Sequence, residues 1–85
     1  MVLRLHDNFE IDNPRHYPAD TVEKLRGLLA QGELAHADPH RANYYELENG
    51  SRVFYIHVSP ASGKVLLLAT WRKDQLAIVP DRAAD

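Results

Sequence analysis

The most regular hydrophobic pattern in the chain predicts an amphipathic helix over residues 18–31. Its apolar positions recur at helical spacing and form a single stripe, made of Val22, Leu25, Leu28 and Leu29. Two features mark alternative starts, because Pro18 suits a first helical turn whereas Asp20 followed by Glu23 is typical of an N-terminal cap. Gly32 stands where a left-handed C-terminal cap is expected. With one apolar face, the helix should pack against a flat apolar surface.

Two segments of alternating residues on either side of Asn49-Gly50 predict a β-hairpin over residues 43–59. An Asn-Gly pair accepts positive φ at both positions, as a type I′ turn requires. With these two residues as the loop, Leu47 is expected opposite Arg52, and the other pairs follow in the same register. One face of the hairpin is expected to be apolar and to meet the helix. The other, more open face is expected to carry carboxylates, phenols and His57.

A third strand is predicted over residues 64–72, after the turn Pro60-Ala61-Ser62-Gly63. If Ser59 pairs with Lys64, the helix side of this strand consists of Val65, Leu67, Ala69 and Trp71, and the open side includes Leu66, Leu68 and Arg72. Apolar residues on both faces are typical of a strand inside a sheet. One short helix covers only one face, so the surplus apolar surface predicts either a dimer or a bound partner.

The remaining segments have weaker patterns. The other candidate extended pieces are short: residues 2–6, the alternating stretch around Phe9 and Ile11, and residues 75–79. Residues 33–42 are interpreted as an irregular connection, and residues 80–85 as a frayed tail. The element order predicts a single small α+β domain over residues 1–85, with one N-terminal strand, one main helix and a three-stranded antiparallel meander packed on the helix.

The composition excludes several classes of protein and site. The chain has 85 residues and no cysteine, which allows one small core and excludes a disulfide scaffold, a thiolate zinc site and a cysteine nucleophile. The longest apolar run, Val65–Ala69, is far shorter than a membrane span, and the first ten residues have no secretory apolar segment. No glycine-rich phosphate loop is present, so no cofactor is expected. We expect a cytoplasmic domain without membrane contact.

The formal net charge of −2 conceals an asymmetry between the two parts of the chain. Residues 1–50 carry five basic and nine acidic side chains, whereas residues 51–85 carry five basic and three acidic ones. From Ser51 to Lys73 there are four basic residues and no acid. This stretch is interpreted either as buried strand, where acids are scarce, or as a small basic surface that faces phosphate or an acidic partner. The negative charge of the whole chain disfavours RNA as that partner.

Basic, aromatic and histidine side chains of the meander are the candidate functional residues. The catalytic candidates are Arg52, Tyr55, His57 and Arg72, and the candidates for binding nucleic acid or another partner are Tyr44, Tyr55, Arg72 and Lys73. Arginine holds phosphate oxygens in pairs, and aromatic rings, here including Trp71, stack on unpaired bases. A histidine among phenols is either a general acid or base, or an ordinary hydrogen-bonded residue of the sheet.

Two histidines and a carboxylate lie close together in the predicted connection, as His36, Asp38 and His40. Such a set is a candidate metal site, but Pro39 breaks helical spacing and no third strong ligand follows at motif distance. The favoured interpretation is therefore a polar loop, and no metal is expected.

The meander resembles the C-terminal half of RelE/HigB-like proteins, the toxin components of bacterial toxin–antitoxin pairs. The resemblance is carried by Tyr44-Tyr45-Glu46-Leu47, Asn49–Tyr55, Lys64–Leu68 and Arg72-Lys73, and with the helix it covers roughly residues 18–73. It implies a compact α/β fold that cleaves messenger RNA on the ribosome without a metal and is neutralised by an antitoxin peptide. Arg52, Tyr55, Arg72 and Lys73 are the positions that match the basic and aromatic pattern of the family.

Three hypotheses about function follow. The leading one is a small RelE-like domain that binds a macromolecular partner, such as an antitoxin-like peptide, through the open face of its sheet. The second is an active endoribonuclease toxin. The third is a non-catalytic homodimer that self-associates through Leu66, Leu68 and the tyrosines.

Overall fold

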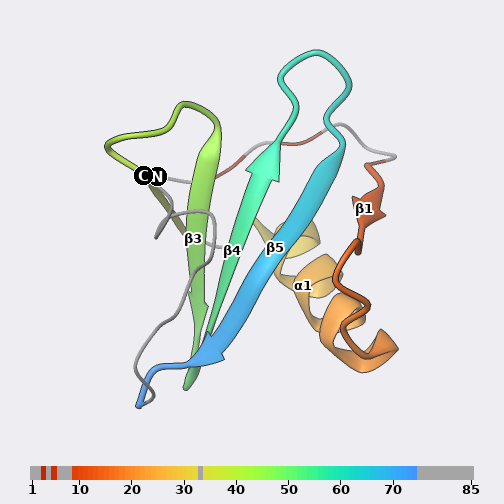
Figure 1. Ribbon diagram of the computed structural model, residues 1–85, viewed down its shortest axis with the longest axis vertical. Coiled ribbons are helices and arrows are strands. Elements are labelled where there is room, and N and C mark those ends of the chain that lie inside the picture. Colours follow the sequence, from red (N-terminus) through yellow and green to blue (C-terminus); the bar gives the residue numbers. More distant parts are fainter. Residues whose placement is uncertain (1–2, 4, 6–8, 33, 75–85) are drawn as a thin grey trace.

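The computed structural model describes residues 3, 5, 9–32 and 34–74, and these form an α+β arrangement of one helix and one five-stranded sheet (Figure 1). In chain order the elements are β1 (Ile11–Asp12), α1 (Ala19–Gln31), β2 (Ala35–Ala37), β3 (Tyr44–Asn49), β4 (Arg52–Val58) and β5 (Val65–Arg72). The strand order is β1-β5-β4-β3-β2, with β1 parallel to β5 and every other neighbouring pair antiparallel. The predicted meander is the centre of this sheet, but the prediction of one N-terminal strand and three meander strands did not include β2.

The helix forms where the hydrophobic stripe predicts it. Pro18 occupies the N-cap position with φ −55° and ψ 151°, so the proline marks the start. Asp20 instead lies inside the first turn, where its carboxylate accepts a hydrogen bond from the Thr21 N–H. Gly32 ends the helix in the left-handed conformation, with φ 75°, and its N–H reaches the carbonyls of the last turn. Leucines at three stripe positions, Leu25, Leu28 and Leu29, are buried.

The main core lies between α1 and one face of the sheet. Helix leucines meet buried residues of β2 to β5, and the sheet side of the cluster consists of Ala35, Leu47, Phe54, Ile56, Val58, Val65 and Leu67. Leu3 and the half-buried Leu5, Phe9 and Ile11 close this core at its margin. Figure 1 shows α1 on one side of the sheet only, so we call the opposite surface the open face. Among the described residues, no helix is long and apolar enough to cross a membrane.

The β3–β4 hairpin differs from the prediction in its register. Asn49 pairs with Arg52 and Tyr44 pairs with His57, so the two-residue loop is Gly50-Ser51 rather than Asn49-Gly50. Gly50 has φ 58°, and Ser51 is not among the residues with positive φ, a combination that suits a type II′ turn with glycine first. Because the register is displaced by two residues, every side chain keeps its predicted face.

The β4–β5 pair begins as predicted and then departs from it. Ser59 N–H donates to the Lys64 carbonyl at 2.9 Å, and Ile56 pairs with Leu67 as expected. Tyr55, however, pairs with Ala69, so Leu68 is an extra residue in a β-bulge. Beyond the bulge the alternation of β5 is reversed. The expectation that Ala69 and Trp71 face the helix was therefore wrong, since both belong to the apolar cluster of the open face.

Both edges of the sheet differ from the prediction. Residues 33–42, expected to be irregular, contain β2, whose three residues pair with β3. Leu3 and Leu5 are not in a strand, and the N-terminal strand is instead β1, which pairs with Val65 and Leu66. Ile11 belongs to the alternating stretch that the sequence offered as a candidate extended piece, although only Ile11 and Asp12 of it pair with β5. The strand considered for residues 75–79 and the tail expected for residues 80–85 lie outside the described residues.

Candidate binding face

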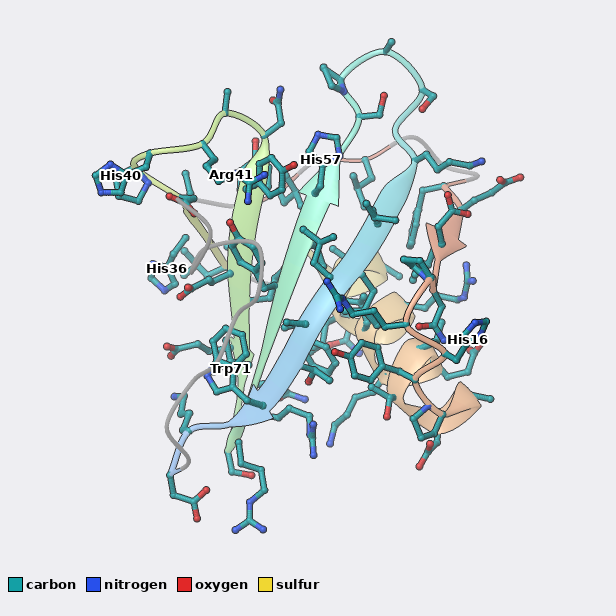
Figure 2. The ribbon with its side chains drawn as sticks, in the orientation of Figure 1. His16, His36, His40, Arg41, His57 and Trp71 are labelled. Atoms are coloured by element: carbon teal, nitrogen blue, oxygen red, sulfur yellow. The ribbon has the colours of Figure 1, made fainter. Side chains whose placement is uncertain are left out.

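The open face carries a second, smaller apolar cluster. Its buried members are Tyr55, Leu68 and Ala69, and the half-buried Tyr44, Leu66 and Trp71 pack against them. The sheet register adds further side chains to this face, namely His36, Glu46 and Glu48 beside His57 and Val53. Figure 2 shows His57 and Arg41 near one end of this face, Trp71 near the other, and His36 at the β2 edge. The face is thus apolar at its centre and mixed in charge around it.

A partly buried hydrogen bond anchors the loop after β2 to the centre of this face. The Tyr55 hydroxyl donates to the Asp38 Oδ2 atom at 2.7 Å, and Tyr55 is completely buried. The other oxygen of the same carboxylate accepts a hydrogen bond from the His40 N–H at 2.9 Å. Asp38 therefore joins the loop to β4. The environment of the catalytic candidate Tyr55 is that of a structural residue, because its ring is buried and its hydroxyl is hydrogen-bonded to Asp38.

The end of the open face nearest the β2–β3 loop is a half-exposed row of three strand residues. Tyr44, His57 and Leu66 are successive cross-strand neighbours on β3, β4 and β5. The rings of Tyr44 and His57 lie 4.7 Å apart at a tilted angle, and Tyr44 also stacks on Tyr55 at 5.9 Å. The Arg41 Cζ atom lies over the Tyr44 ring, 3.9 Å from its centroid, in cation–π geometry. We call Arg41, Tyr44, His57 and Leu66 the aromatic row.

Basic and acidic side chains are interleaved on the open face. The Lys73 ammonium lies 2.9 Å from the Glu48 Oε2 atom near Trp71, and both side chains are partly exposed. Asp38 and Glu46 add two carboxylates to this face, and Arg41 of the aromatic row adds a second cation beside Lys73. This surface is not a basic patch, because acidic side chains are interleaved with the basic ones.

The candidate residues from the sequence fall into two groups on opposite faces. Tyr44, Tyr55 and His57 come together on the open face, and Lys73 reaches it through Glu48. Arg52 and Arg72 instead lie opposite each other on the helix-side face, because the bulge reverses the end of β5. The expectation that Arg72 faces the open side was therefore wrong.

The histidines of the expected polar loop are dispersed. His36 lies in β2 opposite Glu46 and is exposed, whereas His40 lies in the loop that follows. In the part of the chain that the structure describes, no three or more histidine, aspartate or glutamate side chains are gathered so that they could hold a metal ion.

Two residues of this face carry contacts that the sequence does not reveal. Arg41 covers a strand tyrosine from the preceding loop, and no local rule places a loop arginine over a ring three positions later. The role of Asp38 depends on Tyr55 of β4, which is 17 positions away in the sequence.

Comparisons with known proteins add no family to this description. No protein-family model matches the sequence, and no curated protein matches it significantly.

Proposed function

We propose that this protein is a binding domain that holds a peptide segment of a partner protein on the open face, at the aromatic row. The observation that carries the proposal is the row itself, in which Tyr44, His57 and Leu66 are half-exposed neighbours on three adjacent strands. A buried centre beside the row, formed by Tyr55 and Leu68, packs against Tyr44 and Leu66.

The chemistry of the row suits a protein partner. Tyrosine, arginine and other large amphipathic side chains are enriched at the centres of protein interfaces, where they give contact area at low entropic cost. The Tyr44 ring contacts both the Arg41 guanidinium and the His57 ring, so less of its freedom remains to be lost on binding. A partly preorganised aromatic side chain is an efficient anchor for an apolar peptide side chain.

The charges of the open face argue against RNA. Non-specific affinity for nucleic acid comes from cations that neutralise phosphates, and here Glu48 lies within 2.9 Å of Lys73. Asp38 and Glu46 add further negative charge close to the aromatic rings. A peptide with apolar side chains and few charges meets no such penalty.

Two features of the RelE/HigB-like resemblance support the proposal. One is the order of a helix followed by three antiparallel strands, and the other is the expectation of an antitoxin-like peptide as partner. Ribonuclease activity is not part of it. A single catalytic site would need Arg52 and Arg72 beside Tyr55 and His57, but the two pairs lie on opposite faces of the sheet. Tyr55 is moreover buried, so it has no access to a substrate.

Site-specific photo-crosslinking in cells that naturally express the protein tests the proposal. The photoreactive residue p-benzoylphenylalanine replaces Tyr44, whose aromatic shape it approximates, and in the matched control it replaces Lys24 on the exposed side of α1. We expect irradiation to give one discrete adduct with another protein from position 44 and none from position 24. The substitution Leu66→Glu in the same variant should abolish the adduct while the circular dichroism spectrum stays native.

The adduct also distinguishes the competing hypotheses. An adduct between two copies of this chain would replace the peptide partner with self-association. An adduct that contains RNA would revive the nuclease hypothesis, which growth arrest on induced expression would then test independently. Equal labelling from positions 44 and 24, or none from either, would contradict a binding role for the open face.

A further inference from the structure

Two arginines face each other across neighbouring strands on the side of the sheet away from the aromatic row. Arg52 of β4 and Arg72 of β5 are direct cross-strand partners. Both follow the alternation of Phe54 and Thr70, a pair on the helix side, so both side chains extend on that face. Like charges placed directly opposite in a sheet are destabilising. The pair therefore has an electrostatic cost, which the Asp74 carboxylate beside Arg72 offsets in part and which a bound anion would lower further.

The Arg52 guanidinium is held in one orientation by a threonine. Its Nη1 atom donates to the Thr70 Oγ1 atom at 3.1 Å, while the Thr70 hydroxyl donates its own proton to the Val53 carbonyl at 2.9 Å. The hydroxyl can only accept from Arg52, because its single proton is already used. This arrangement leaves the edge formed by the Nε and Nη2 atoms of Arg52 directed away from Thr70.

That edge of Arg52 is unoccupied within the described chain. Thr70 is the hydrogen-bond partner of the side chain there, and no described carboxylate lies within 4.0 Å of it. No buried side-chain nitrogen or oxygen of the described residues lacks a partner, so the Nε and Nη2 atoms are reachable from solvent. Arg72 differs, because its Nη2 atom lies 2.9 Å from the Asp74 carboxylate. Arg52 is thus a half-buried cation without a compensating acid, beside a second, exposed guanidinium.

We propose that Arg52 and Arg72 form a binding site for an oxyanion, either a phosphate group or a carboxylate. The Nε–H and Nη2–H groups of arginine lie side by side and match two oxygens of such a group, and charge-assisted pairs of this kind are the strong hydrogen bonds of proteins. Thr70 orients the Arg52 fork before binding, and Arg72 supplies the second cation. The site is independent of the proposed peptide site, since the two lie on opposite faces of the sheet.

Nuclear magnetic resonance titration of the isotopically labelled, full-length protein tests the site. The Nε–Hε resonance of Arg52 is followed as sodium phosphate replaces sodium chloride at constant ionic strength and pH 7, and a second titration uses sodium acetate. We expect a saturable shift at millimolar phosphate, about tenfold weaker in Arg52→Lys, which keeps the charge but loses the fork. The substitution Thr70→Val, which removes only the orienting hydroxyl, should weaken binding by about threefold to tenfold.

The control and the second variant make the outcome decisive. Lys24→Gln removes one exposed positive charge on α1 and should leave the phosphate affinity unchanged. Arg72 is exposed enough for Arg72→Gln to fold, and this variant should also bind more weakly than the wild type. Saturation by phosphate alone assigns the site to phosphate, and equal saturation by acetate assigns it to oxyanions in general. A linear response to both anions up to about 100 mM, or an equal loss in Lys24→Gln, would overturn the proposal.

Discussion

The hydrogen bond between Tyr55 and Asp38 should contribute more to the free energy of unfolding than most other single polar contacts of the domain. Replacing Tyr55 with phenylalanine keeps the buried ring and its packing against Leu68 and Ala69, and removes only the hydroxyl that donates to the Asp38 Oδ2 atom at 2.7 Å. The carboxylate then loses a donor in a half-buried position. A hydrogen bond to a charged group contributes about 1.5–3 kcal/mol, so Tyr55→Phe should lower the free energy of unfolding by that amount.

Tyr44→Phe is the matched control, because it removes the same atom from a stacked neighbour on the same face. Tyr44 is half-exposed, and no hydrogen bond of its hydroxyl to a described residue is present. Its loss should therefore change the free energy of unfolding by no more than about 0.5 kcal/mol. Urea denaturation followed by circular dichroism measures both values, and the melting temperature of Tyr55→Phe should fall by at least about 6 °C.

A double-mutant cycle isolates the contact from other effects of each substitution. Asp38→Ala alone should cost more than Tyr55→Phe, since it also removes the acceptor of the His40 N–H. In the double variant, the two losses should overlap by about 1.5–3 kcal/mol. Strict additivity, or a Tyr55→Phe cost equal to that of Tyr44→Phe, would refute the idea that this bond anchors the loop to β4.

Two further pairs of substitutions test the fold in the same denaturation assay. Leu25 has no exposed surface, so Leu25→Ala should lower the free energy of unfolding by about 2–5 kcal/mol. Leu34 is 56% exposed, so Leu34→Ala should lower it by no more than about 0.5 kcal/mol. Similar values for the two variants would contradict the packing of α1. Gly27→Ala and Gly50→Ala should have opposite signs although neither added Cβ meets an atom within 4 Å. The helical Gly27→Ala should stabilise by about 0.5–1 kcal/mol, whereas Gly50→Ala, at φ 58°, should destabilise by about 1–2 kcal/mol; a gain at both positions would exclude the assigned turn.

Local sequence pattern was sufficient to predict the elements whose signals lie within their own residues. The stripe of leucines and Gly32 define α1 without reference to the rest of the chain, and the alternation of β3 and β4 assigns each side chain to its face even though the register was displaced. β2 could not be found in this way, and for β1 the pattern offered only a candidate extended piece around Phe9 and Ile11. Strands of two and three residues have too little sequence for a period, and they exist because β5 and β3 offer them free backbone partners.

Only those features of the open face that depend on local sequence pattern were predicted. Tyr44 and His57 were correctly placed on the open face, because alternation within a hairpin is local. The partners of Tyr44 and Tyr55 were not foreseen, since Arg41 and Asp38 reach them from a loop that sequence periodicity describes only as irregular. Contacts between a loop and a distant strand depend on the three-dimensional path of the loop, which a one-dimensional pattern does not contain.

The bulge at Leu68 decides what each face of the sheet is able to bind. Without it, strict alternation from Val65 would place Trp71 against α1 and Arg72 on the open face beside the tyrosines. The extra residue gives Tyr55 two small-to-medium apolar neighbours, Leu68 and Ala69, and so completes a buried centre under the aromatic row. The same reversal moves Arg72 across the sheet to face Arg52. One inserted position thus separates an aromatic surface of mixed charge from a pair of guanidinium groups, and it makes the two proposed binding sites independent of each other.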